Sequence, residues 1–174
     1  MNQIVATFYQ FVALPDYCEL RNSLQIHCNK NELKGTILLA EEGINGTVVG
    51  TREGIDALNG WIEADGRFDR CEYKESFVNT GNAPFYRMKV KIKKEIVTLG
   101  IPWISPMVKT GHYVEPDAWN DLILDPDTIT VDTRNNYEHE VGSFRGAVHS
   151  KTKSFREFPK WVATNLDPQK HKKI

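Results

Sequence analysis

The chain has 174 residues, of which 40% are hydrophobic and 26% are charged, and its formal net charge is −1. This length suits one domain or two small ones, and the near-zero charge means that a nucleic-acid partner must be met by a local basic face. The three cysteines form no Cys-x-x-Cys pair, and their odd number is typical of a protein in a reducing compartment. The longest apolar runs are too short to span a membrane, and the N-terminus lacks the basic-then-apolar order of a signal peptide. We therefore expect a cytoplasmic protein without membrane contact.

The first half of the chain predicts the element order β-α-β-β-α-β, which is that of ferredoxin-like α+β domains. Strands are expected over 4–12, 36–40 and 47–49, with a fourth that includes Cys71 and Tyr73. Asp16 and Glu19 have the spacing of a capping box at the start of the first helix, and Thr51 can cap the second. The helices are expected to bury Tyr17, Leu20, Leu24 and Cys28 in the first, and Ile55, Leu58 and Ile62 in the second.

The segment 41–46, "EEGING", is expected to be a turn in which Asn45 takes a positive φ. A lone pair of glycines is a weak indicator of a phosphate cradle. No arginine precedes the first helix, so we expect no acylphosphatase activity.

Residues 85–100 contain a strand whose two faces differ in chemistry. Met88, Val90 and Ile92 are expected to face the core, and basic residues alternate with them. The basic side chains are Arg87, Lys89, Lys91 and Lys93, followed by Lys94. They can neutralise RNA phosphates while Phe85 and Tyr86 stack on bases, or they can serve as the solvated lysines that protect an edge strand.

Residues 100–112 hold prolines and glycines without a period and are expected to be a linker between a domain over 1–99 and a second over 113–174. The second half predicts a helix over 113–128, strands over 129–132 and 147–149, a helical turn over 136–141 and a last helix over 155–166, hence a parallel α/β sheet. Two strands are too few for such a sheet, which is normally covered on both faces. We therefore expect an incomplete domain in which Ile174 begins a third strand.

The residues "VDTR" at 131–134, "YE" at 137–138 and "RGAV" at 145–148 resemble the first signature of rhodanese domains. The blocks 35–48, 89–100, 111–123 and 152–162 resemble the rhodanese-like tRNA uridine 5-hydroxylases, bacterial proteins that join an acylphosphatase-like domain to a rhodanese domain. The resemblance implies oxygen-dependent hydroxylation of carbon 5 of the wobble uridine, with the tRNA anticodon arm as partner and molecular oxygen as co-substrate. No cofactor is identified from the residues themselves.

The resemblance also implies an essential cysteine in a Cys-x-x-Gly-x-Arg loop, which would lie beyond residue 174. None of Cys18, Cys28 and Cys71 is therefore assigned to catalysis. Two alternatives stay open, a rhodanese-type sulfurtransferase and a non-catalytic RNA-binding module.

Asp132 and Arg134 are candidates for residues that support catalysis, because they lie at the carboxyl end of a strand, where open α/β sheets bind ligands. They either contact the reacting groups or brace the active-site loop by ion pairing. Glu138 is a candidate helix cap, and Arg145 either reaches a phosphate or is solvated. A second basic patch comprises Lys170, His171, Lys172 and Lys173.

Overall fold

The computed structural model describes residues 3–78, 85–167, 169–170 and 173–174, and it divides into two compact units. The first extends to Val97 and includes Pro106–Val108, and the second comprises Thr98–Ser105 and Lys109–Ile174. The segment 100–112, expected to be a linker, is thus shared between the two units. His171 and Lys172 of the expected second basic patch lie outside the described residues.

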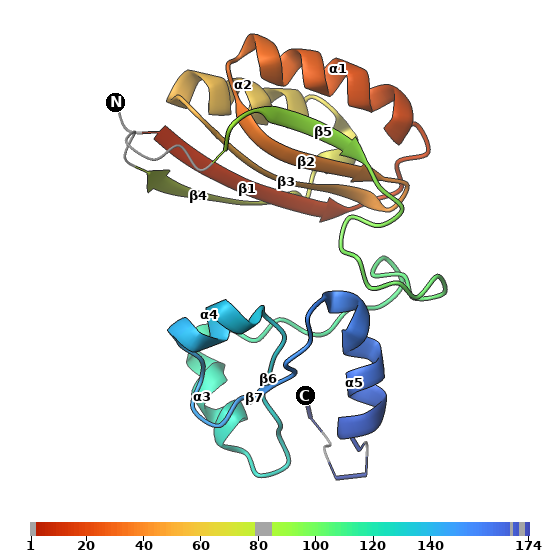
Figure 1. Ribbon diagram of the computed structural model, residues 1–174, viewed down its shortest axis with the longest axis vertical. Coiled ribbons are helices and arrows are strands. Elements are labelled where there is room, and N and C mark those ends of the chain that lie inside the picture. The colour runs from red at the N-terminus through yellow and green to blue at the C-terminus, as the bar shows by residue number, and fades with distance from the viewer. Residues whose placement is uncertain (1–2, 79–84, 168, 171–172) are drawn as a thin grey trace. The chain divides into compact units, whose positions relative to one another are not determined.

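The first unit is a five-stranded sheet with two helices on one face (Figure 1). The strand order is β4-β1-β3-β2-β5, with β5 parallel to β2 and the other neighbours antiparallel. The elements are β1 (Gln3–Phe11), α1 (Tyr17–Lys30), β2 (Lys34–Ala40), β3 (Gly43–Gly50), α2 (Arg52–Glu63), η1 (Gly66–Phe68), β4 (Glu72–Val78) and β5 (Met88–Ile92). The first four strands and two helices confirm the predicted ferredoxin-like order, although Cys71 lies just before β4 and not within it.

The core lies between the sheet and the two helices. Alternate side chains of the strands, such as Phe8, Ile37 and Leu39, are fully buried against the helices. The predicted helix faces are confirmed, because Leu24, Cys28, Ile55, Leu58 and Ile62 are buried and Tyr17 and Leu20 pack against them. Thr51 caps α2 as expected, accepting a hydrogen bond from the Gly54 amide at 3.3 Å.

The capping box expected at α1 is wrong. Asp16 precedes the helix but makes no capping hydrogen bond, and its carboxylate instead accepts a hydrogen bond from the Arg67 guanidinium. Arg67 also binds Asp65, the residue that caps η1. A charge-assisted bond to arginine is stronger than a bond to a neutral backbone amide, so the Arg67 contact holds the carboxylate.

The turn expected over 41–46 is also shorter than predicted, because only Glu41 and Glu42 form it and β3 begins at Gly43. Asn45 lies within this strand and donates to the Ile96 carbonyl at 3.1 Å, so its expected positive φ is wrong. Gly43 takes the positive φ, at 145°, and a Cβ there would stand 2.1 Å from the Gln10 carbonyl oxygen. Close approach of neighbouring strands therefore requires this glycine.

The second unit contains a two-stranded parallel sheet surrounded by short helices. Its elements are α3 (Pro116–Leu124), β6 (Val131–Asp132), α4 (Asn136–Val141), β7 (Val148–His149), η2 (Phe155–Glu157) and α5 (Phe158–Asn165). β6 and β7 pair in parallel, and an isolated parallel bridge joins Thr128 to Lys173. A third parallel segment therefore begins to pair next to Ile174, where a further strand was expected.

Burial differs sharply between the two units. Every buried hydrophobic side chain among the described residues belongs to the first unit, between Ile4 and Ile96. The buried side chains of the described second unit are polar, Asp132 and Ser150, whereas Leu124 and Val141 are 78% and 90% exposed. A parallel sheet is normally covered on both faces by apolar side chains, and the described residues of the second unit alone do not provide this cover. No described helix combines the length and apolar character that a membrane crossing requires.

Candidate functional site

The strand β5 separates apolar and basic side chains as its sequence predicts. Met88 and Val90 point into the core, whereas Arg87, Lys91 and Lys93 are exposed and Lys89 is half-buried. Ile92 departs from the prediction and is 40% exposed, because it lies at the end of the strand, beyond the core cluster. The structure thus brings the four predicted basic residues to one edge of the sheet, on the side that α1 and α2 leave open.

Side chains of α1 form hydrogen bonds to the backbone at the centre of this edge strand. The Val90 amide donates to Gln25 Oε1 at 2.8 Å, and Arg21 Nε donates to the Val90 carbonyl at 3.3 Å. Both backbone groups of Val90 would otherwise be free to pair with a foreign strand. Edge protection at Val90 is therefore supplied by Gln25 and Arg21 and does not depend on the lysines of β5.

Aromatic side chains precede the basic strand. Tyr86 is 99% exposed and Phe85 is half-buried, and Lys94 is exposed beyond the other end of β5. An exposed phenol ring beside several cations can stack on a nucleobase while the cations bind its phosphates. This juxtaposition of ring and charge is the feature of the first unit that suits a nucleic acid.

Asp132 is the hub of the second unit. It is 8% exposed, and both of its carboxylate oxygens accept hydrogen bonds. Oδ1 accepts from the backbone amide and Nε of Arg134, at 3.1 and 3.0 Å, and Oδ2 accepts from Arg134 Nη2 and Ser143 Oγ, both at 2.7 Å. The Arg134 guanidinium and then the Ser143 hydroxyl hold the pKa of Asp132 well below its usual range. The carboxylate is therefore ionised and unsuited to act as a general acid or base near neutral pH.

The partners of Asp132 tie the segment after β6 together. Arg134 Nη2 also donates to the Gly142 carbonyl at 2.7 Å, and its own carbonyl lies 3.2 Å from His149 Nε2. The His139 ring lies 3.3 Å from Asp132 Oδ2 and stacks on His149 with centroids 4.2 Å apart. This arrangement matches a bracing role for Asp132 and Arg134. The contributions of Ser143 and His149 are not apparent from the sequence, because their partners lie 11 and 15 positions away.

Glu138 lies in the capping box of α4, where its Oε2 accepts from the Asn135 backbone amide at 3.2 Å, as the capping interpretation predicts. A hollow of about 580 Å³ adjoins the Asp132 hub and is lined in part by Trp119 and Phe144, whose rings lie 4.9 Å apart. The Trp119 indole N–H is buried there without a hydrogen-bond partner among the described residues. Arg145 is exposed.

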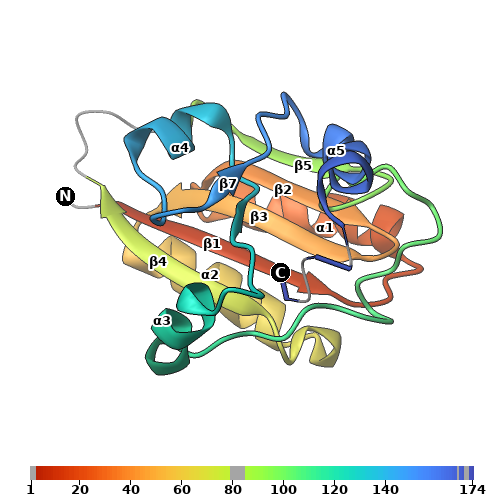
Figure 2. The same ribbon diagram turned by 90° about the horizontal axis from the view of Figure 1, so that it is seen from below.

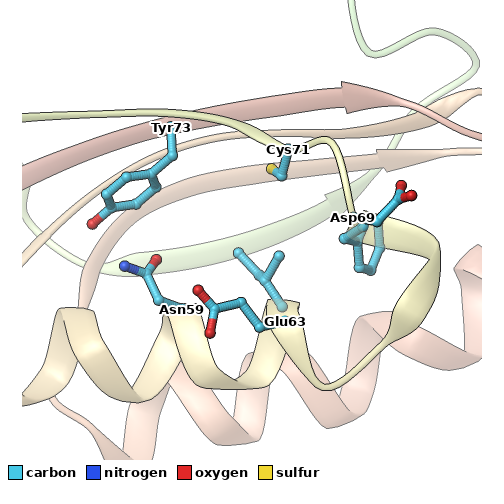
Figure 3. A pocket seen from close by; sticks show the side chains of 7 residues that line it. Asn59, Glu63, Asp69, Cys71 and Tyr73 are labelled. Carbon is cyan, nitrogen blue, oxygen red and sulfur yellow. The ribbon is translucent and has the colours of Figure 1, made fainter.

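The cysteines of the first unit are held as neutral thiols or lie on the surface. Burial raises the pKa of Cys28 to about 12, and burial followed by the charge of Glu72 raises that of Cys71 to about 11. Figure 3 shows Cys71 at a small pocket of about 210 Å³, where Asn59 and Glu63 of α2 lie opposite Tyr73 of β4. A thiolate is the reactive form, so neither thiol is prepared for nucleophilic attack. Cys18 is exposed, and the described residues contain no cluster of histidine, cysteine and carboxylate side chains suited to a metal.

The sheet order and the two helices define the first unit as a ferredoxin-like α+β domain of the acylphosphatase-like type. Residues 3–96 match the family model described as the UPF0176 acylphosphatase-like domain, and the chain belongs to this family.

Several solved structures resemble part of the chain at low identity. The acylphosphatase from Bacillus subtilis is 14% identical, with 52% of this chain and 99% of that chain covered and a TM-score of 0.39. The acylphosphatase from Coxiella burnetii is 12% identical, with 52% and 93% covered and a TM-score of 0.36. A bacterial light-regulated adenylyl cyclase is 15% identical, with 53% of this chain but only 28% of the cyclase covered and a TM-score of 0.42.

Proposed function

We propose that the protein modifies tRNA by oxygen-dependent hydroxylation of carbon 5 of the wobble uridine. The observation that carries the RNA-binding part is the placement of Arg87, Lys89, Lys91 and Lys93 along one edge of the sheet, on the side that α1 and α2 leave open, while Met88 and Val90 enter the core. Cations that are not used for packing, beside the exposed ring of Tyr86, suit the phosphates and bases of an anticodon arm.

In this proposal the second unit is the opening part of a rhodanese domain. The support is the buried Asp132 with its Arg134 pair, the parallel β6-β7 sheet and the absence of a buried apolar core among the described residues of this unit. The resemblance implies an essential cysteine in a Cys-x-x-Gly-x-Arg loop, and residues 1–174 contain no such motif. Asp132 and Arg134 act as positioning residues that hold β6 to the segment that follows it, through Gly142, Ser143 and His149.

The reaction replaces the C5–H bond of uridine by C5–OH. One atom of molecular oxygen enters the product, and the other leaves as water after taking up two electrons and two protons from a reductant. The uridine must leave its stack to reach a pocket, which costs least in an unpaired loop. An anticodon loop meets this requirement.

The test measures 5-hydroxyuridine in total tRNA from a strain that lacks the gene. The modified nucleoside should fall in the deletion strain and return when the full-length gene is restored. Restoration with Lys89→Glu should be weaker than restoration with Lys30→Glu, a matched charge reversal on α1, and restoration with Lys89→Glu and Lys91→Glu together should be weaker still. Unchanged 5-hydroxyuridine in the deletion strain, in the absence of a redundant pathway, would sink the proposal.

Two other functions give different results in the same strains and with the purified full-length protein. A sulfurtransferase would form thiocyanate from thiosulfate and cyanide without changing 5-hydroxyuridine. A non-catalytic RNA-binding module would bind tRNA and form neither product.

A further inference from the structure

Figure 2 views the five-stranded sheet from the face that α1 and α2 leave open. Directly paired residues of neighbouring strands place their side chains on the same face. Because Phe8 and Ile37 point to the helices, their neighbours Thr7 and Thr36 point the other way. The row through Thr7, here called the threonine row, runs Lys74, Thr7, Thr47, Thr36, Lys89.

The threonine row has uncharged hydroxyls at its centre and a lysine at each end. Thr7 and Lys74 are exposed, and Thr36, Thr47 and Lys89 are half-buried. Four interstrand spacings of about 4.8 Å place the two lysines roughly 19 Å apart. The face therefore offers a flat uncharged strip between two cationic margins.

The margin formed by β5 and the end of β2 is the more basic of the two. Lys34 is two residues before Thr36 in β2, so its side chain lies on the open face, as does that of its partner Val49 in β3. Arg87 directly precedes β5 and alternates with Lys89 and Lys91. Alternate residues of a strand are about 6.6 Å apart, which is comparable to the spacing of successive phosphates in an extended single strand. A row of cations at this spacing can follow one RNA backbone.

One end of this face, along the strand direction, is covered by the chain and carries the carboxylate of Glu72. Asn45 donates to the Ile96 carbonyl, and Ile96 is buried, so the chain after β5 covers this end of the sheet. Among the paired strand residues of this face, Glu72 alone is acidic, and it lies opposite Tyr9 at the covered end. The threonine row lies away from the covered end and from Glu72. Both the charge and the accessibility of the face therefore favour an anion near the threonine row.

We infer that the open face binds an unpaired segment of RNA, with its phosphates along Arg87, Lys89 and Lys91 and its bases turned onto the threonine row. This inference rests on the proposed function and adds to it the form of RNA that is recognised and the surface that recognises it. A flat sheet accommodates splayed bases, whereas a duplex turns its bases inward and presents phosphates on a curved surface. Bases can lie on the uncharged strip while the phosphates follow the more basic margin.

The test uses the full chain and fluorescence anisotropy with a labelled ten-nucleotide unpaired RNA and a ten-base-pair RNA duplex. The unpaired RNA should bind at least several-fold more tightly than the duplex. Thr7→Glu should weaken its binding and Thr7→Lys should strengthen it, because Thr7 is the exposed threonine of the row, on the strand next to Lys74. The two variants place a long side chain at the same position, so opposite effects on binding cannot come from a shared effect on folding.

Lys89→Gln with Lys91→Gln should reduce the slope of log affinity against log salt by about 1.4, since each phosphate contact with a single strand contributes about 0.7. Lys30→Gln on α1 is the control and should leave the slope unchanged. Tighter binding of the duplex, or equal effects of Thr7→Glu and Thr7→Lys, would overturn the inference. If 5-hydroxyuridine still depends on the gene in that case, the proposed function stands without this surface. If the RNA binds as inferred but 5-hydroxyuridine is independent of the gene, the proposed function fails.

Discussion

Gly46 lies in β3 against the ring of Phe8, and replacing it by alanine should destabilise the first unit. A Cβ at Gly46 would stand 2.5, 2.9 and 3.0 Å from Cζ, Cε2 and Cε1 of Phe8. Phe8 is fully buried, so its ring cannot relieve the contact by moving into solvent. Overpacking of this kind costs about 1–3 kcal/mol of unfolding free energy. We expect Gly46→Ala to fall within that range.

Urea unfolding followed by tryptophan fluorescence and by circular dichroism measures this effect. Gly60→Ala is the matched control, because Gly60 is an exposed residue of α2 with nothing within 4 Å of an added Cβ. This change should stabilise the protein by about 0.5–1 kcal/mol, because alanine favours a helix over glycine. Two substitutions of the same type are therefore expected to act with opposite sign.

A double-mutant cycle with Phe8→Leu tests the assigned cause. Leucine removes the ring atoms that the new Cβ would meet, so the double variant should be more stable than the sum of the single effects by about 1 kcal/mol. Strict additivity of the two changes, or wild-type stability of Gly46→Ala, would refute the steric reasoning.

Three further predictions concern charge, thiols and the second unit. Arg52 and then Tyr73 lower the pKa of Glu75 from 4.5 to about 2, so the stabilising contribution of this carboxylate is present above pH 4.5 and is lost as the pH falls toward 2. The difference in unfolding free energy between wild type and Glu75→Gln, measured by urea unfolding, should therefore narrow over that interval, and a constant difference would contradict the assignment. Iodoacetamide should label exposed Cys18 in the native protein and label Cys28 and Cys71 only after unfolding, as peptide mass spectrometry can establish; native labelling of Cys28 would be the contrary result. Asp132→Asn should weaken the Arg134 and Ser143 contacts and speed hydrogen exchange over 132–149 while exchange in β1 and β3 stays unchanged.

The errors in the predicted first unit share one physical origin. Asp16 was expected to cap α1, and Asn45 was expected to form a turn, because both interpretations use neighbouring residues alone. Their actual partners, Arg67 and Ile96, each lie 51 positions away in the sequence. Local spacing predicts what a side chain can do nearby, and it carries no information on a stronger partner brought in by the fold.

The candidate sites were predictable to different degrees. The alternation of Met88 and Val90 with the basic residues predicted which side chains of β5 are packed and which are free, since the period of a strand is fixed by its geometry. The Asp132–Arg134 pair was also expected from residues two positions apart. The closure of the Val90 edge by Arg21 and Gln25 was not, because these residues come from a helix more than sixty positions earlier.

The sequence by itself determined the helix faces, the alternating strands and the order of elements in the first unit, because each depends on a period of two or 3.6 residues along the chain. Only the tertiary structure decided that β5 lies beside β2 and that Lys74 and Lys89 end one row of threonines. It also decided that the described second unit has no buried apolar side chain. Strand order and burial depend on which distant segments pair, and this is settled by the packing of the whole domain.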